Sequence, residues 1–400
     1  MGFKDESRLS SSRTVLIHEF VTGGGLADED LPPSLAREGR AMRRALAGDF
    51  AAASGVRVVM TIDPREPDAE APGPWKIVRI GPGDERSRVA SLATEADCTL
   101  IIAPETGGLL LDRARMLDQL GVPSLGCSPE AVAVTGNVLT TLDRLQNAGV
   151  RTPPTRVVSP RRDWPRRPTF PPVDLARVCP FVEIPEPLAD FPPHLAKLAE
   201  IEHPSVLKPV DGAGAVQTFV LAGEAPWPDP SWAPEVAVLQ PWIEGEPRSV
   251  SVLVSSDGHP MIVGIASQRT RVDRGRLSYA GGVAPLPGSP AVSRMVEQVV
   301  GAIPGLRGWV GIDWIDDGQG DPIVLEVNPR PTTSIVGFLA ILPPGMLAQS
   351  WLDVLDDPGA PLPRRLADRV LASVASPVSF EPDGRLSPSP SSSPRAGAGS

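Results

Sequence analysis

The sequence has few of the residues that build disulfide frameworks and soft-metal sites. Only three cysteines occur in 400 residues, at Cys98, Cys127 and Cys179, and no two of them form a CxxC pair. The four histidines are scattered along the chain. An odd number of widely spaced cysteines is typical of free thiols. We therefore expect a reducing, cytoplasmic location, with neither a disulfide framework nor a zinc site.

Long apolar runs and an excess of positive charge are also lacking. No stretch approaches the roughly 18–20 apolar residues that a membrane span requires, and the start, MGFKDESRLSSSR, has no apolar segment after its charges. The net charge of −10 leaves no surplus of Lys and Arg for the phosphates of a nucleic acid. We expect a chain that binds neither membranes nor nucleic acids, although a small anion needs only local positive charge.

Short β-rich runs alternate with helical stretches through the first 125 or so residues. The expected strands lie at 15–17, 56–62, 100–103 and 122–125. The expected helices lie at 34–53, 86–95, 109–120 and 130–147. Such alternation indicates crossover connections and a parallel sheet. Residues 13–128 are therefore predicted to form a Rossmann-like α/β domain, preceded by a disordered lead-in at 1–12.

Prolines crowd the next part of the chain, and proline cannot donate a hydrogen bond to a β-ladder. Residues 129–204 are predicted to hold a linker helix, a Pro-rich insertion and the first lobe of a second domain. Regular structure is expected again at 205–356, as strands joined by turns. Residues 357–400 are predicted to be an extension whose tail, after Phe380, is too low in complexity to fold.

The stretch 308–330, GWVGIDWIDDGQGDPIVLEVNPR, is typical of a β-hairpin, because two apolar runs flank a turn-forming cluster at 316–321. A turn centred in this cluster places Asp313 opposite Glu326. Opposed carboxylates lie about 5 Å apart at Cβ and repel each other. Burial among apolar neighbours adds a further cost unless a cation lies between them. The pair therefore predicts a bound cation.

Two more polar residues, Asn328 and Arg330, follow Glu326 on the same face of its strand. Asp313, Glu326 and Asn328 offer only oxygen ligands, which suit Mg²⁺ or Mn²⁺ held together with substrate phosphates. Arg330 is placed to meet a phosphate oxygen or a developing negative charge. The alternative is a row of solvated side chains on the open face of an antiparallel sheet.

A candidate phosphate site lies in 205–220, SVLKPVDGAGAVQTFV. A strand that bears Lys208 is followed by a loop of small residues, Gly212, Ala213 and Gly214. Small residues let backbone amides approach phosphate oxygens, while the lysine supplies a point charge. An ordinary hairpin turn with a surface lysine is the alternative.

A candidate base site lies in 236–254, VAVLQPWIEGEPRSVSVLV. An apolar strand ends at Gln240 and leads into a bend whose backbone can pair with an adenine edge. Trp242 and Ile243 offer apolar contact in this bend, and Glu246 is placed to accept hydrogen bonds from a ribose. A pair of strands that merely links two domains is the alternative.

In this order, the segments resemble the ATP-grasp superfamily across most of residues 14–350, with LEVNPR at 325–330 as the most specific element. HEFVTGGG at 18–25, APET at 103–106 and YAGG at 279–282 are similar to the tyramine–L-glutamate ligases of methanofuran biosynthesis and their bacterial relatives. The resemblance implies an α/β (α+β ATP-grasp) fold. In that fold a Rossmann-like pre-ATP-grasp domain precedes a two-lobed ATP-grasp domain with antiparallel sheets.

The resemblance also implies roles for individual residues. Those expected to contact ATP are Lys208, Gly212, Ala213, Gly214, Gln240, Trp242, Ile243 and Glu246. Those expected to bind the metal are Asp313, Glu326 and Asn328, and Arg330 and Lys208 are expected to act in catalysis. Members usually carry a basic residue near the start of the helix around Asn137, where this chain has Val138, and some carry an arginine at Gly311.

The activity implied is that of an ADP-forming ligase that makes a C–N (amide) bond with ATP and Mg²⁺ or Mn²⁺. ATP phosphorylates a carboxylate, and an amine then attacks the acyl phosphate. The leading expectation joins glutamate to tyramine or a similar amine, in methanofuran-type cofactor synthesis. Another ATP-grasp amino-acid or peptide ligase, or an ATP-binding protein with weakened catalysis, is the alternative.

Small-molecule carboxylate and amine substrates are the expected partners, and a homodimer is left open. The arginine-rich stretch RTRVDRGR at 269–276 is interpreted as a solvated loop or a lid. The TGGG turn at 22–25 is either a simple strand-to-helix connection or a border of a substrate site.

Overall fold

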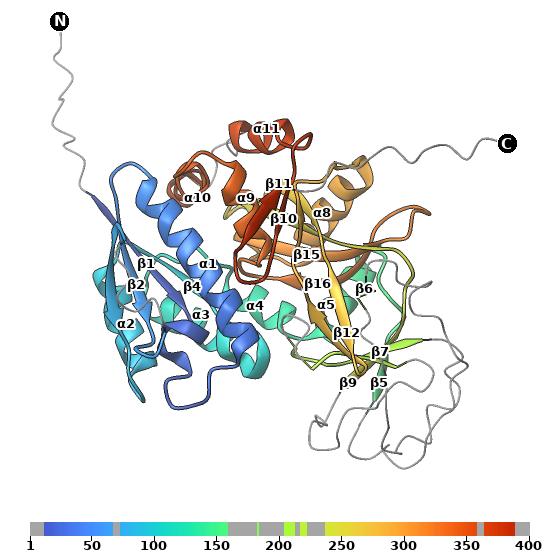
Figure 1. Cartoon of the computed structure of the whole chain (residues 1–400), viewed down its shortest axis with the longest axis horizontal. Coiled ribbons are helices and arrows are strands. Elements are labelled where there is room, and N and C mark those ends of the chain that lie inside the picture. Colours follow the sequence, from blue (N-terminus) through green and yellow to red (C-terminus); the bar gives the residue numbers. More distant parts are fainter. Residues whose placement is uncertain are drawn as a thin grey trace, which may run out of the picture.

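The computed structural model describes residues 12–66, 73–158, 182–183, 204–212, 217–221, 237–357 and 364–388. A unit built from the N-terminal third of the chain lies at the left of Figure 1, beside the sheets formed by the later residues. The predicted lead-in and most of the Pro-rich insertion lie outside the described residues.

The N-terminal unit contains a parallel four-stranded sheet in the order β3-β2-β1-β4. Its strands are β1 (Arg13–Glu19), β2 (Val56–Ile62), β3 (Trp75–Arg79) and β4 (Cys98–Ile102). Its helices are α1 (Pro33–Ala52), α2 (Glu85–Glu95) and α3 (Leu109–Gln119), with short turns η1 (Val21–Gly25) and η2 (Thr106–Gly108). β4 is buried along its whole length, as expected for a parallel sheet covered on both faces. The predicted α/β unit is confirmed.

Two local predictions for this part were wrong. The helix expected at 130–147 is two helices, α4 (Pro129–Thr135) and α5 (Val138–Asn147). Asn137 has an extended backbone and its side chain accepts hydrogen bonds from the amides at the start of α5, so a new helix begins there. The strand expected at 122–125 is a single bridge between Ser124 and Thr99, because Pro123 has no amide to extend the pairing.

Antiparallel sheets dominate the later residues, as predicted. One has the order β11-β10-β15-β16, and its strands are β10 (Glu246–Val254), β11 (Pro260–Ser267), β15 (Gly308–Asp316) and β16 (Ile323–Asn328). A seven-stranded sheet has the order β5-β9-β7-β8-β13-β12-β6. Its strands are β5 (Arg156–Val158), β6 (Val182–Glu183), β7 (Ser205–Pro209), β8 (Phe219–Leu221), β9 (Ala237–Pro241), β12 (Thr270–Asp273) and β13 (Arg276–Tyr279).

The arginine-rich stretch 269–276 was interpreted as a solvated loop or a lid; the loop is wrong, and the lid stays a prediction. The stretch forms β12 and the start of β13, a hairpin within the seven-stranded sheet. Val272 alternates with charged neighbours and is buried against Val220. Arg271, Arg274 and Arg276 are exposed on this hairpin, whereas Arg269, before β12, is half-buried and pairs with Glu381.

Helices that the sequence reasoning missed cover the antiparallel sheet: α8 (Pro290–Ala302), α9 (Ser334–Ile341), α10 (Met346–Asp356) and α11 (Arg364–Ala372). The predicted unfolded tail also begins too early. Strands β14 (Gly282–Ala284), β17 (Val378–Phe380) and β18 (Leu386–Pro388) form a three-stranded sheet, anchored by the fully buried Phe380. Residues 389–400 lie outside the described residues.

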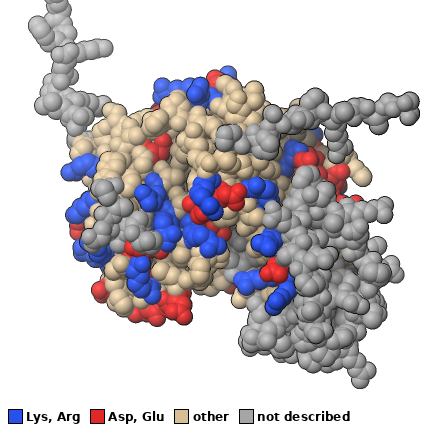
Figure 2. All heavy atoms as spheres, in the orientation of Figure 1, with Lys and Arg blue, Asp and Glu red and all other residues tan. Residues whose placement is uncertain are grey.

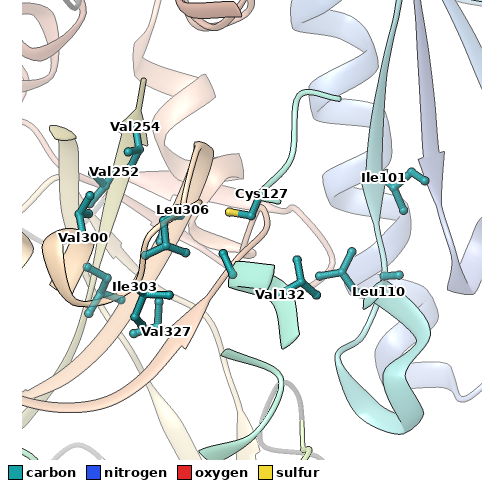
Figure 3. Packing of buried hydrophobic residues seen from close by; sticks show 14 of the residues in the cluster. Ile101, Leu110, Cys127, Val132, Val252, Val254, Val300, Ile303, Leu306 and Val327 are labelled. Atoms are coloured by element: carbon teal, nitrogen blue, oxygen red, sulfur yellow. The ribbon is translucent and has the colours of Figure 1, made fainter. Parts of the chain in front are cut away.

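One buried apolar cluster joins the two units. Figure 3 shows Ile101 and Leu110 of the N-terminal unit leading through Val132 and Cys127 to Val327 and its neighbours in the antiparallel sheet. A continuous buried cluster fixes the relative position of the elements that contribute to it. Any cavity between the two units therefore has walls that are held in place.

The predicted free thiols are confirmed for Cys98 and Cys127, and Cys179 lies outside the described residues. Burial raises the pKa of both described thiols to about 12. Within the described ranges no single helix is long and apolar enough to cross a membrane, and α9 and α10 reach that length only together, across a bend of 107°. Charges of both signs are intermixed on the described part of the face in Figure 2.

Candidate active site

A cavity of about 690 Å³ lies between the N-terminal unit and the two larger antiparallel sheets. Its volume is in the range of small-molecule sites, which span about 300–1,000 Å³. It is lined by many of the predicted contacts: Lys208, Gly212, Gln240, Trp242, Ile243, Asp313, Glu326, Asn328 and Arg330. Residues that are more than a hundred positions apart in the chain therefore meet at one site.

Three of the predicted ATP contacts are not found in this lining. Ala213 and Gly214 lie outside the described residues. Glu246 is described, but its carboxylate pairs with Arg248 at 2.5 Å, and Arg248 also pairs with Asp316 at 3.2 Å. The structure thus places Glu246 in a surface ion-pair network beside the cavity.

The predicted pairing of the hairpin is confirmed, because Asp313 of β15 lies opposite Glu326 of β16. A β-bulge follows directly after this pair and places the extra residue, Leu325, in the cavity lining. Burial and the Asp313 carboxylate raise the pKa of Glu326 to about 7, although the positive charge of Lys208 lowers this pKa. Burial also raises the pKa of Asp313. Two ionised carboxylates here require a cation.

The oxygens at this site fit a hard metal ion. Asp313 Oδ2 accepts a hydrogen bond of 3.2 Å from the Asn328 amide. Ser249, directly opposite Asp313 on β10, and Gln268 also line the cavity, and both side chains lie close enough to the Asp313 carboxylate to oppose the rise in its pKa. Carboxylate and amide oxygens are the kind of ligands that Mg²⁺ takes.

No group of three or more His, Cys, Asp or Glu that could hold a metal occurs in the described part of the chain. A metal ion at the Asp313–Glu326 pair would therefore depend on Asn328 and on ligands from a substrate. Mg²⁺ is commonly bound in this way, by one or two carboxylates together with substrate phosphates.

Lys208 approaches the carboxylate pair from β7. Burial lowers the pKa of this lysine, and the charges of Glu326 and Asp313 oppose that effect. The loop that follows is tied down at two points: Asp211 accepts a hydrogen bond from the Gly107 amide at 3.1 Å, and the Val210 carbonyl accepts one from the Val138 amide at 2.7 Å. Both partners belong to segments outside the seven-stranded sheet, so they hold the start of the small-residue loop beside the cavity.

Val138, which replaces an expected basic residue, lies at the first turn of α5 and lines the cavity. The amides of Leu139 and Thr140 donate to the Asn137 side chain. The structure therefore places an apolar group, beside a capped helix start, where a second cationic contact was expected.

The bend after β9 supplies an apolar wall. Trp242 and Ile243 line the cavity, and among the described residues the buried Trp242 indole Nε1 has no hydrogen-bond partner. The Trp242 backbone amide is already used, because it donates to the Pro204 carbonyl at 2.7 Å. Gln240 is held by a hydrogen bond of 2.9 Å to Thr155. The bend is thus a rigid platform with one free indole donor.

Arg330 has a partner that the sequence reasoning missed. Its guanidinium donates two hydrogen bonds of 2.9 Å to Glu105, whose side chain is 4% exposed against 11% for Arg330. Glu105 follows β4 and lies in the APET stretch, which was noticed only for its likeness to a family. The two units of the protein are therefore joined, directly after β16, by a buried bidentate ion pair.

The N-terminal unit contributes further lining residues that the sequence reasoning missed. Phe20 and Val21 line the cavity directly before the TGGG turn, and Leu26 does so directly after it. Thr22, in the turn itself, donates its amide and hydroxyl to Glu19 at 2.7 and 2.6 Å. The turn thus folds around Glu19, and its flanking residues face the cavity.

Comparison with known proteins agrees with this architecture. A family model described as an ATP-grasp domain matches residues 182–334, and one described as a pre ATP-grasp 3 domain matches residues 56–132. The chain is 26% identical to the tyramine–L-glutamate ligase of Methanocaldococcus jannaschii over 268 residues. The match covers 66% of this chain and 66% of that relative, so it spans just under two thirds of the relative's length. It is 24% identical to the enzyme of the same name from Methanocaldococcus fervens over 331 residues, 81% of this chain and 89% of the relative.

A solved structure from Archaeoglobus fulgidus, described as an ATP-grasp superfamily protein, shares the fold. Its TM-score is 0.55 at 22% identity, and the match covers 82% of this chain and 85% of that chain. The predicted combination of a Rossmann-like unit with a two-lobed region of antiparallel sheets is thereby confirmed. The chain thus contains an ATP-grasp domain, matched at residues 182–334, and a pre-ATP-grasp domain ahead of it, matched at residues 56–132.

Proposed function

We propose that this protein is an ATP-dependent carboxylate–amine ligase that joins the γ-carboxylate of glutamate to tyramine or a similar aromatic amine. The observation that carries the proposal is the meeting of Lys208, Arg330 and the opposed Asp313–Glu326 pair in one cavity. The names of the two curated relatives support the choice of glutamate and tyramine.

In the proposed reaction a carboxylate oxygen of glutamate attacks the γ-phosphorus of ATP, and the bond to ADP breaks. The amine first gives up its ammonium proton, and its neutral nitrogen then attacks the acyl carbon, inorganic phosphate leaves, and the nitrogen loses a second proton. Lys208 and Arg330 bind and orient the charged groups in both steps. Asp313, Glu326 and Asn328 would hold Mg²⁺, which when bound neutralises phosphate charge.

The test is release of ADP in the presence of Mg²⁺ across a panel of carboxylates and amines. We expect release that depends on glutamate and is faster with an aromatic amine. Hydroxylamine in place of the amine should trap the acyl phosphate as a hydroxamate. ATP binding without substrate-dependent ADP for any pair would refute the ligase proposal and favour a protein that only binds nucleotide.

The matched variants are Glu326→Ala and Glu297→Ala. Glu297 is exposed on α8, away from the cavity lining, so its replacement should leave ADP release unchanged. Glu326→Ala should abolish release while the folded state is retained, as judged by circular dichroism. Full activity of Glu326→Ala would contradict the assignment of the metal site.

A further inference from the structure

The wall of the cavity built by the N-terminal unit has a distinct chemistry. Four residues of α1 contribute to it, namely Leu35, Glu38, Gly39 and Met42. They lie three, four and seven positions apart and therefore share one face of the helix. A Cβ at Gly39 would lie 2.5 Å from Glu19 Oε2, so glycine is needed for α1 to pack this closely against β1. The result is an apolar helix face with a single carboxylate at its middle.

The basic side chains are confined to one end of the cavity. Among its described lining residues, the only Lys and Arg are Lys208 and Arg330, both beside the carboxylate pair. The lining residues between positions 19 and 109 include acidic side chains but neither Lys, Arg nor His. Phosphates and substrate carboxylates suit the end that holds Lys208 and Arg330, whereas the N-terminal wall suits a group of positive charge.

Of the acidic residues on this wall, Glu38 is the one available to a ligand inside the cavity. The Glu19 carboxylate is occupied by the amides of Val21 and Thr22 and by the Thr22 hydroxyl. Glu29 and Asp30 are exposed. Glu38 is half-buried, and within the described residues it forms no ion pair and accepts one hydrogen bond of 3.1 Å, from the Thr333 hydroxyl.

Burial raises the pKa of Glu38, and neither the Thr333 hydrogen bond nor the nearby charges of Arg330 and Arg37 cancel the effect. The folded protein therefore keeps a carboxylate in a cavity without a full counter-charge. A ligand that brings a cation would remove this cost.

The position of Glu38 also suits the reaction. Its partner Thr333 lies three residues after Arg330, directly before α9, in the segment that follows the strand carrying Glu326 and Asn328. Glu38 thus stands at the junction between the apolar wall and the catalytic end of the cavity. An amine nitrogen held there would lie close to the reacting carboxylate, which is how binding lowers the entropy cost of a two-substrate reaction.

We propose that Glu38 recognises the acceptor substrate: its carboxylate binds the ammonium group of a primary amine, and the apolar body of that amine lies against Phe20, Leu35 and Met42. This inference rests on the proposed function and adds to it the place where the amine binds. It predicts selection for cationic amines with an aromatic or other apolar body.

The test compares Glu38→Gln with the native chain in two reactions. Glutamine keeps the shape and still accepts the Thr333 hydrogen bond, so the fold should be retained. Loss of a charge-assisted contact should lower kcat/KM for the most active amine of the panel by about 10–100-fold, mainly through KM. Hydroxamate formation from glutamate and hydroxylamine should stay unchanged, because hydroxylamine is small and largely uncharged at neutral pH. Glu297→Gln is the control and should alter neither reaction.

A neutral competitor gives a second test. This competitor is the alcohol that has a hydroxyl in place of the amino group of the substrate, and its inhibition constant for the native enzyme should be well above the KM of the amine. In Glu38→Gln the two should bind nearly equally. A purely structural role for Glu38 would weaken the alcohol and the amine together.

The outcomes separate the two proposals. An unchanged kcat/KM for the amine in Glu38→Gln, with hydroxamate still formed, would overturn the inference and leave the ligase proposal standing. Equal loss of both reactions would also overturn it, because Glu38 would then support the fold or carboxylate activation. A native enzyme that forms neither hydroxamate nor amide would overturn the ligase proposal itself, and the inference with it.

Discussion

Removing the Glu105 carboxylate should destabilise the protein and slow catalysis through Arg330. The two side chains share two hydrogen bonds of 2.9 Å and are 4% and 11% exposed. Breaking a buried pair by removing one partner typically costs about 3–5 kcal/mol, because the remaining charge is left uncompensated. Glu326 and Glu38 lie near enough to Arg330 to offset part of this loss. We therefore expect Glu105→Gln to lower the free energy of unfolding by about 2–3 kcal/mol.

The assay is a double-mutant cycle with Glu105→Gln, Arg330→Met and the combined variant, measured by urea unfolding and by ADP release. The combined variant should lose little more stability than either single variant, which gives a coupling energy of about 2 kcal/mol. Glu105→Gln should reduce kcat about tenfold, since a misplaced guanidinium stabilises the transition state less well. It should have no further effect on kcat when Arg330 is already absent.

Additive losses in the cycle would refute this reasoning, because they would show that Glu105 acts independently of Arg330. The matched control is the exposed pair of Arg294 and Asp321, whose side chains are 61% and 60% exposed. Asp321→Asn should change the free energy of unfolding by less than about 1 kcal/mol, as is general for surface ion pairs.

Three further changes have defined outcomes. Glu326→Gln should abolish ADP release. In the absence of Mg²⁺ the same variant should raise the melting temperature measured by differential scanning fluorimetry, because it removes a like charge beside Asp313. A lower melting temperature would contradict this expectation. Burial opposes ionisation of Glu85, but hydrogen bonds from His18 and Arg113 lower its pKa to about 2. The stabilisation that ionised Glu85 gives is therefore complete above the unfolded-state pKa near 4.5 and is lost as the pH falls towards 2. Glu85→Gln should remove about 2 kcal/mol at neutral pH and flatten urea-unfolding stability between those pH values. Asp49→Ala should cost about 1–3 kcal/mol in thermal unfolding, because Asp49 accepts the Gly345 and Ala348 amides at the start of α10.

The parts of the site that lie on one hairpin were predictable from the sequence. The turn cluster between β15 and β16 determines which residues face each other, so Asp313 and Glu326 were paired correctly. The β-bulge between this pair and the turn was not predictable, because nothing in the alternation of IVLEVN marks Leu325 as an extra residue. Local patterns thus paired the two carboxylates correctly but did not give the irregular register next to the turn.

Contacts between the two units were outside the reach of local patterns. Glu105 pairs with a residue 225 positions away, and Glu38 accepts a hydrogen bond from one 295 positions away. A single acidic residue on an amphipathic helix is normally read as part of its solvated face. Only the docking of α1 against the segment after β16 turns Glu38 towards the cavity.

This dependence on docking explains why the shared apolar cluster matters for function. Glu105 can meet Arg330, and Glu38 can meet the proposed acceptor amine, only if the N-terminal unit is held at a fixed distance from β15 and β16. Reacting groups tolerate errors of only about 0.5 Å. Val132 and Cys127 lie in the buried cluster that spans the two units. The Trp351 indole of α10 also donates a hydrogen bond of 3.0 Å to the Leu125 carbonyl, which links the two units. A cavity whose basic residues lie at one end and whose other wall is acidic therefore depends on uncharged side chains to keep the two ends at a fixed distance.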